Sequence, residues 1–315
     1  MPTIPVMGDG LPPALVELLG PEIEVLAWDD SPQSTALARA VGMITYGHPI
    51  VDGSLMDRAP HLKVISNHGV GVDHIEVAAA EARRIPVGNT PGCLDASTAD
   101  MTMALILAAA RNIVVGDRFA RGPEFTHYDP AILIGQEVTG STLGVVGLGR
   151  IGRQVAKRAR AFDMRVLYHN RNRTESAEHE FGVTYRSLDQ LLAESDFVSL
   201  NCPLTPATTG MISRREFGLM KRSAFLINVA RGPVVDHDAL FDALASRTIA
   251  GAAVDVTSPE PLPRDHRLLA LDNLIITPHL GSASNRTRQR MIEMTVENLF
   301  AGLRGDDLPY RVRPR

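Results

Sequence analysis

The chain has 315 residues, of which 44% are hydrophobic and 22% charged, and its formal net charge is −4. This length allows two domains with separate cores, and the slightly acidic balance argues against nucleic acid or an anionic membrane as partner. The N-terminus lacks the basic and apolar regions of a secretory signal, and the apolar stretch Met101–Ala110 is too short to span a bilayer. Two cysteines, Cys93 and Cys202, suggest neither a metal cluster nor a disulfide scaffold. We therefore expect a cytoplasmic protein without a metal centre.

Residues 1 to about 90 alternate short apolar runs with stretches of helical periodicity. The expected strands are Ile4–Met7, Ile23–Ala27, Gly42–Tyr46, Lys63–Ser66 and Pro86–Gly88. The expected helices lie at Ala14–Leu19, Ser34–Ala40, Leu55–Arg58 and Ile75–Arg83. Strands that alternate with helices in this way are typical of a parallel α/β domain.

A glycine-containing loop, Ser66–Asp73, leaves the fourth of these strands. Its glycines would expose successive backbone N–H groups, among them those of Val70 and Gly71, in a nest that suits a carboxylate. The alternative is an ordinary strand-to-helix turn in which Asp73 caps the helix. His68 is a single histidine in a loop, and such a residue is usually at the surface.

A hinge is expected at Thr90–Gly92, because a Pro-Gly pair ends regular structure. The helix expected next, Ala96–Ala110, is apolar on nearly all faces and should be buried. Residues 112–141 read as irregular and carry several aromatic side chains. This segment is a candidate for an arm that packs on a second subunit.

The stretch from Thr142 to Arg173 has the order of strand, glycine turn, helix and strand that a dinucleotide-binding unit requires. Gly147 would allow the tight turn, Gly149 would let the backbone approach a pyrophosphate, and Gly152 would let the helix pack closely on the strand. The pyrophosphate would bind the free N–H groups at the helix N-terminus. A glycine turn with a purely structural role is the alternative.

The residues after the second strand of this unit indicate which dinucleotide binds. NAD sites usually have Asp or Glu there, whereas this chain has Asn170, followed by Arg171 and Arg173. Two guanidinium groups can bind a 2′-phosphate through charge-assisted hydrogen bonds. The pattern predicts NADP(H), and the alternative is a solvated basic loop.

Four further apolar strands follow, and each ends on a polar or reactive residue. They are Phe197–Asn201 before Cys202-Pro203, Ala224–Ala230 before Arg231, Ile249–Val256 before the Glu260 loop, and Leu274–Thr277 before Pro278-His279. Because ligands bind outside the carboxyl ends of parallel strands, Arg231, Glu260 and His279 should meet at one sheet edge. There His279 could donate a proton to a carbonyl, Glu260 could fix the histidine tautomer, and Arg231 could bind a carboxylate. Taken singly, each residue could be merely structural.

The Gly147–Gly152 loop, Asn228–Gly232, Asp255–Pro263 and Pro278–Ala283 closely resemble the corresponding motifs of the D-isomer-specific 2-hydroxyacid dehydrogenases. Within that family they look most like the glyoxylate/hydroxypyruvate reductases. The resemblance covers nearly the whole chain.

The resemblance implies an α/β fold of two Rossmann-like/flavodoxin-like parallel-sheet domains with the active site in the cleft between them. Residues 1–95 plus 286–315 would form the substrate (catalytic) domain, 96–285 the dinucleotide-binding domain, and the segment after the hinge would join a homodimer. Arg231, Glu260 and His279 would be catalytic, and the N–H groups of Val70 and Gly71 would bind the substrate carboxylate. The expected cofactor contacts are Gly147, Gly149, Arg150, Ile151, Gly152, Asn170, Arg171, Arg173, Cys202, Pro203, Val229, Ala230, Asp255 and Gly281.

Two departures from relatives bear on the substrate. The reductases often carry a Trp-rich stretch before the cofactor strand, whereas Gly122–Tyr128 has no Trp, so the preferred substrate side chain stays open. Formate dehydrogenases have Gln where Glu260 stands, so formate oxidation is not expected.

We therefore predict an NADPH-dependent reductase of small 2-oxo acids, of the glyoxylate or hydroxypyruvate type, that forms D-2-hydroxy acids. One alternative is a 2-ketogluconate reductase, which would need a roomier pocket. Another is a dinucleotide-sensing protein like the transcriptional corepressors that share this fold. The presence of Arg231, Glu260 and His279 together favours an enzyme.

Overall fold

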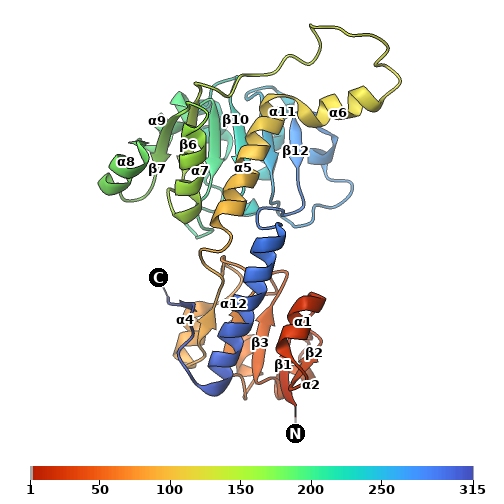
Figure 1. The fold of residues 1–315 in the computed structure, drawn as a ribbon, viewed down its shortest axis with the longest axis vertical. Coiled ribbons are helices and arrows are strands. Elements are labelled where there is room, and N and C mark those ends of the chain that lie inside the picture. The colour runs from red at the N-terminus through yellow and green to blue at the C-terminus, as the bar shows by residue number, and fades with distance from the viewer. Residues whose placement is uncertain (1–2, 315) are drawn as a thin grey trace. The chain divides into compact units, whose positions relative to one another are not determined.

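The computed structural model describes residues 3–314, which divide into two compact units (Figure 1). Within the described chain, unit 1 comprises residues up to 94 together with those from 284 onward, and unit 2 comprises residues 95–283. The boundaries expected from the sequence lie one or two residues later than these. The predicted fold class is confirmed, because each unit is built on a parallel sheet with helices packed on it.

Unit 1 contains a six-stranded sheet in the order β13-β5-β4-β3-β1-β2. Its strands are β1 (Ile4–Met7), β2 (Ile23–Leu26), β3 (Gly42–Thr45), β4 (Val64–Asn67), β5 (Val87–Gly88) and β13 (Arg311–Val312). The first five pair in parallel, as the sequence predicts, whereas β13 is antiparallel to β5. Strand β13 is not predicted from the sequence, because a two-residue strand is too short to show a period.

The longest helix of unit 1 comes from the far end of the chain. The helices are α1 (Pro13–Leu19), α2 (Thr35–Arg39), α3 (Gly53–Asp57), α4 (Val77–Ala82) and α12 (Asn285–Arg304). A Cβ atom at Gly302 would collide with the side chain of Val64, so α12 approaches β4 as closely as only glycine allows (Figure 1). The Ser66 hydroxyl also donates a hydrogen bond to the Thr295 carbonyl at 2.7 Å. These contacts fix α12 along β4, from Val64 at the start of the strand to Ser66 near its end.

Unit 2 contains a seven-stranded, wholly parallel sheet in the order β12-β11-β10-β9-β6-β7-β8. Its strands are β6 (Thr142–Val146), β7 (Arg165–His169), β8 (Thr184–Tyr185), β9 (Phe197–Leu200), β10 (Phe225–Asn228), β11 (Gly251–Val254) and β12 (Leu274–Ile276). The strand order reverses direction at β6, which has β7 on one side and β9 on the other. Such a reversal opens a ligand-binding crevice at the carboxyl ends of the two strands.

Helices cover both faces of this sheet (Figure 1). They are α5 (Asp95–Ala110), α6 (Ile113–Arg121), α7 (Arg150–Arg160), α8 (Glu175–Phe181), α9 (Leu188–Glu194), α10 (Arg214–Leu219) and α11 (His237–Ala245), with short 3-10 turns at Gly232–Val234 and Arg267–Ala270. Helix α5 packs against α7 and is largely buried, as its composition predicts.

The expectation of irregular structure throughout residues 112–141 is wrong for α6. This helix begins with Ile113, Val114 and Val115, and β-branched residues favour strands over helices. None of its residues is buried. Within residues 3–314, no single helix is long and apolar enough to cross a membrane, and only the pair α5 and α6, bent by 59°, meets those criteria together.

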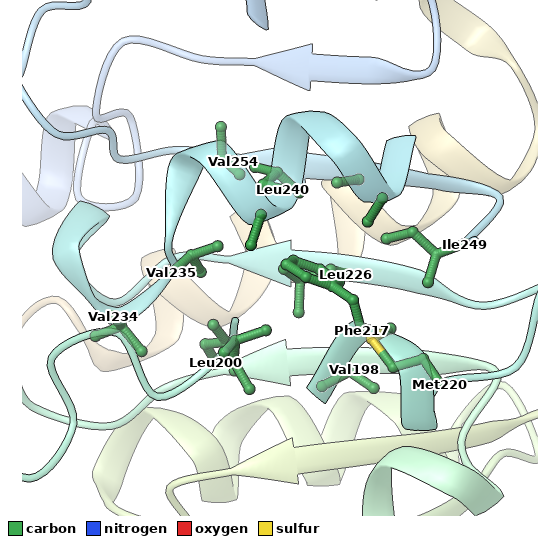
Figure 2. Close-up of a cluster of buried hydrophobic side chains, with 14 of the residues drawn as sticks. Val198, Leu200, Phe217, Met220, Leu226, Val234, Val235, Leu240, Ile249 and Val254 are labelled. Carbon is green, nitrogen blue, oxygen red and sulfur yellow. The ribbon is translucent and has the colours of Figure 1, made fainter. Parts of the chain in front are cut away.

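Figure 2 shows one of the two cores of unit 2, in which strands β9, β10 and β11 contribute side chains to the same layer as α10 and α11. Val198, Leu226 and Val254 come from the three neighbouring strands, and Phe217 and Leu240 come from the helices. All five are at most 2% exposed. Because this layer is fully packed, the carboxyl ends of β10 and β11 are fixed relative to each other.

Candidate active site

The glycine loop between β6 and α7 packs directly on the end of the neighbouring strand. Gly147 has a φ of 98°, and a Cβ atom there would lie 2.7 Å from the backbone nitrogen of Cys202. A Cβ at Gly152 would collide with the carbonyl oxygen of Gly147, whereas a Cβ at Gly149 would meet no protein atom within 4 Å. Gly149 is the N-cap of α7, and no side chain caps this helix end. The first N–H groups of α7, from Arg150 onward, are thus left for a ligand such as a pyrophosphate, for which the loop has room.

The three candidate cofactor residues after β7 differ in the contacts that their side chains make. The Asn170 side-chain oxygen accepts a hydrogen bond of 2.7 Å from the backbone N–H of Leu148, so Asn170 braces the glycine loop. Arg173 donates from Nε and Nη2 to both oxygens of Glu178, at 2.7 and 2.9 Å. The carboxylate holds the pKa of Arg173 above its usual range, and the pKa of Glu178 is lowered to about 2. Arg171 is exposed and makes no side-chain hydrogen bond or ion pair within residues 3–314.

The backbone around Arg231 is held in place by the side chain of Asn228. The fully buried amide of Asn228 accepts from the N–H of Ala230 at 3.0 Å and donates to the carbonyl of Arg231 at 2.9 Å. A Cβ at Gly232 would collide with the carbonyl of Thr257, so the loops after β10 and β11 are in backbone contact. The strand-end loops therefore form one rigid surface.

A buried carboxylate organises the loop that carries His279. Asp255 is 2% exposed and accepts hydrogen bonds from the Thr277 hydroxyl at 2.6 Å and from the N–H groups of Leu280 and Gly281 at 2.7 Å each. Its own carbonyl accepts from the N–H of His279 at 2.9 Å. His279 adopts a φ of 56°, a left-handed conformation that costs energy for a residue with a side chain. The four hydrogen bonds to Asp255 compensate for that cost.

His279 and Glu260 form a close pair, as the sequence predicts from their positions after β12 and β11. Nδ1 of His279 lies 2.7 Å from Oε1 of Glu260, and the two side chains are 30% and 39% exposed. A carboxylate can only accept, so Nδ1 carries the hydrogen of this contact, and Nε2 is the other ring nitrogen at which a proton can be exchanged.

The other expected cofactor residues line the same sheet edge. Cys202 and Pro203 follow β9, next to the glycine loop, and Val229 and Ala230 follow β10. Cys202 is partly buried, and burial raises the pKa of its thiol to about 11. Cys202 is therefore a neutral thiol near pH 7 and not a nucleophile. No group of side chains within residues 3–314 has the arrangement of a metal site.

In unit 1, the loop after β4 presents unpaired backbone N–H groups. The Asn67 amide donates to the carbonyls of Gly69 and Gly71 at 2.9 Å each, and Asn89 donates to the carbonyl of Val70 at 2.8 Å. These bonds turn the three carbonyls toward the protein. The N–H groups of Val70 and Gly71 find no acceptor in the described chain, so the loop is a nest for an anion.

His68 precedes this nest, and the expectation that it lies at the surface is wrong. The imidazole is partly buried, with Nδ1 at 3.0 Å from the Thr295 hydroxyl and its ring centroid 5.2 Å from that of Tyr46. Burial and the positive charge of Arg288 lower the pKa of His68 to about 4.

Comparison with known proteins agrees with this geometry. The model of the D-isomer specific 2-hydroxyacid dehydrogenase, NAD binding domain, matches residues 103–281, which is more than half of the chain. A curated relative, the glyoxylate reductase of Korarchaeum cryptofilum, is 48% identical over 263 residues, covering 83% of this chain and 79% of the relative.

The chain belongs to the D-isomer specific 2-hydroxyacid dehydrogenase family.

Two solved structures extend the likeness over nearly the whole length of this dehydrogenase. A Thermus thermophilus protein is 46% identical with a TM-score of 0.88, covering 98% of this chain and 99% of its own. The NADPH-dependent glyoxylate/hydroxypyruvate reductase of Sinorhizobium meliloti, solved with NADP and malonate, is 31% identical with a TM-score of 0.90, covering 100% and 99%. The resemblance inferred from the motifs is confirmed.

Sequence reasoning missed the residues that hold the site in place. Asn67, Asn89 and Asn228 stand at or just after strand ends, where Asn67 and Asn228 bind carbonyl oxygens of their own loops and Asn89 binds one in the loop after β4. The oxygens of Asp255 bind the loop that carries His279, and its predicted contact with the cofactor stays a prediction. A polar residue at the end of a buried strand is the sequence feature that indicates such a hydrogen bond to the loop backbone.

We predict that Asp255→Asn lowers the free energy of unfolding by about 2–3 kcal/mol. An amide offers one acceptor oxygen instead of two, so at least one buried N–H of the loop would face an NH2 group. Thr277→Val removes a single donor and should cost only about 1 kcal/mol. Chemical denaturation of both variants measures the difference, and equal losses would contradict a bracing role for the carboxylate.

Proposed function

We propose that this dehydrogenase reduces a small 2-oxo acid of the glyoxylate or hydroxypyruvate type to the D-2-hydroxy acid, with NADPH preferred over NADH. The observation that carries the proposal is the 2.7 Å pair of His279 and Glu260 at the sheet edge that also holds the glycine loop. Relatives named glyoxylate reductase and glyoxylate/hydroxypyruvate reductase support this substrate class.

Each residue of the site has its own role in the proposed reduction. A reduced nicotinamide would supply the hydride to the carbonyl carbon. The imidazolium form of His279 gives its Nε2 proton to the carbonyl oxygen and becomes the neutral Nδ1–H tautomer, and Glu260 stabilises the imidazolium before the transfer through Nδ1. Arg231 binds the carboxylate and polarises the carbonyl. The N–H groups of Val70 and Gly71 donate hydrogen bonds to the substrate carboxylate in their nest.

The dinucleotide is proposed to bind along the glycine loop, with the pyrophosphate on the N-terminus of α7. The strand-end residues Cys202, Pro203, Val229, Ala230 and Gly281 would flank it. For the 2′-phosphate the main ligand is Arg171, because its guanidinium is exposed and has no acidic partner in the described chain. Arg173 shares its charge with Glu178 but keeps its Nη1 donors for a ligand.

We also propose that the protein is a cytoplasmic homodimer joined through α6 and the segment after it. This segment extends away from the rest of unit 2 (Figure 1), and α6 contributes no buried residue. Its large apolar side chains are unusually open: Ile113, Phe125, Tyr128 and Ile134 are 54%, 49%, 81% and 77% exposed. Several large apolar side chains exposed on one segment are typical of a protein interface.

Replacing His279 with Ala should lower kcat for the preferred 2-oxo acid by about a thousandfold, because the proton donor is lost. NADPH affinity, measured by fluorescence titration, should change less than about twofold, since His279 lies outside the glycine loop. Glu260→Gln keeps an acceptor for Nδ1 and should lose less activity than His279→Ala. Near-normal turnover of His279→Ala with glyoxylate, hydroxypyruvate, pyruvate and 2-ketogluconate as candidate acids would refute the assignment.

Replacing Arg171 with Ala should weaken NADPH binding by about 10- to 100-fold and leave NADH binding nearly unchanged, because only NADPH carries the 2′-phosphate. Arg173→Ala should have the smaller effect, since Glu178 already occupies two of its donors. Dissociation constants of both dinucleotides decide between the arginines. Equal losses for NADPH and NADH in Arg171→Ala would remove the basis for NADPH preference.

Sedimentation equilibrium should give twice the chain mass of 34.1 kDa for the natural protein. The double substitution Tyr128→Asp and Ile134→Asp should shift it to monomer, because charges would enter an apolar interface. Leu18→Asp on α1 is a matched control, with a similarly open apolar side chain at 47% exposure. A monomeric natural protein, or a dimer that survives the double substitution, would contradict the proposed interface.

A further inference from the structure

The imidazole of His68 has no role in the proposed reaction, although it lies directly beside the anion nest. It follows β4, and the Val70 and Gly71 N–H groups are two and three residues further along the chain. Two residues span at most about 7 Å, so the ring lies within reach of a small molecule held by the nest. Its neighbours are the Tyr46 ring on one side and Thr295 of α12 on another.

The hydrogen bonds of Thr295 determine which nitrogen of His68 carries the hydrogen. The Thr295 hydroxyl donates to the Met291 carbonyl at 2.7 Å, so its oxygen can only accept from the imidazole at 3.0 Å. A hydroxyl has one hydrogen, and Nδ1 of His68 must therefore be the donor. In the neutral ring, Nε2 then has a lone pair and no hydrogen.

This acceptor nitrogen is available to a ligand. Within residues 3–314, Nε2 of His68 has no hydrogen-bonding partner, and it is not a buried atom. The nearby charge of Arg288 and partial burial keep the ring neutral at physiological pH, since together they lower the pKa to about 4. A neutral Nδ1–H imidazole can accept a hydrogen bond through Nε2, and a protonated one cannot.

We propose that Nε2 of His68 accepts a hydrogen bond from a hydroxyl group at C3 of the 2-oxo acid, so that the site prefers hydroxypyruvate to pyruvate. This inference rests on the proposed function. With the substrate carboxylate on the N–H groups of Val70 and Gly71, the acceptor stands next to the carbon chain. Pyruvate differs from hydroxypyruvate only by this hydroxyl, and it would leave Nε2 without a partner. A site that binds a hydroxyl discriminates against the analogue that lacks it.

The test compares kcat/KM for hydroxypyruvate and pyruvate in the natural enzyme and in His68→Phe. Phenylalanine keeps a ring beside Tyr46 but has no acceptor, and Thr295 retains its bond to Met291. The natural enzyme should prefer hydroxypyruvate by about tenfold or more. His68→Phe should lose most of this preference because kcat/KM falls for hydroxypyruvate and stays nearly unchanged for pyruvate. His68→Gln, whose amide oxygen can accept near the position of Nε2, should restore part of it.

The outcomes separate the two proposals. If the natural enzyme reduces both acids and His68→Phe leaves their ratio unchanged, or lowers both equally, the role of His68 is wrong and the reductase function stands. If His68→Phe does not fold, the ratio of kcat/KM for hydroxypyruvate and pyruvate is measured in His68→Gln and Thr295→Val instead. In Thr295→Val the acceptor for the Nδ1 hydrogen is lost, so the hydrogen can move to Nε2. The preference for hydroxypyruvate should then fall. If the natural enzyme reduces no 2-oxo acid, both proposals fail together.

Discussion

The buried carboxylate of Asp255 is the interaction on which the arrangement of unit 2 depends most. It binds the Thr277 hydroxyl and two backbone N–H groups, and it therefore fixes the loop after β12 to the end of β11. His279 sits in that loop in a left-handed conformation, and Glu260 reaches it from the loop after β11. Four hydrogen bonds thus hold a strained residue in one orientation. Without a fixed loop, the 2.7 Å contact between His279 and Glu260 would have no defined geometry.

In both units, side-chain amides at strand ends fix the loops that follow the strands. In unit 1, Asn67 and Asn89 bind the carbonyls of residues 69–71 and leave the N–H groups of that loop outward. In unit 2, Asn228 fixes the backbone of Arg231, and Asn170 braces the glycine loop. A loop whose carbonyls are satisfied internally can offer only donors to a ligand, and anions bind donors. In unit 1, this arrangement leaves the N–H groups of Val70 and Gly71 available for the proposed carboxylate.

Electrostatics at the carboxyl edge of unit 2 come from a few pairs rather than from the net charge. Arg173 and Glu178 neutralise each other beside Tyr168, whose hydroxyl also donates to Glu178 at 2.8 Å. Arg171, only two residues away, is exposed and has no such partner within residues 3–314. The sequence pattern predicts the same role for both arginines, but they differ in the electrostatic attraction that they can offer a phosphate.

The sequence by itself determined the alternating strands and helices, the glycine loop, the strand-end positions of Arg231, Glu260 and His279, and hence the family. These features depend on local periodicity and on the rule that parallel strands share one carboxyl edge. Only the tertiary structure decided the helix α6, the antiparallel strand β13, the pairing of Arg173 with Glu178, and the partly buried, Nδ1-protonated state of His68. Each of those depends on a residue or surface brought close by folding. His68 and Thr295 are 227 residues apart, so no local pattern could link them.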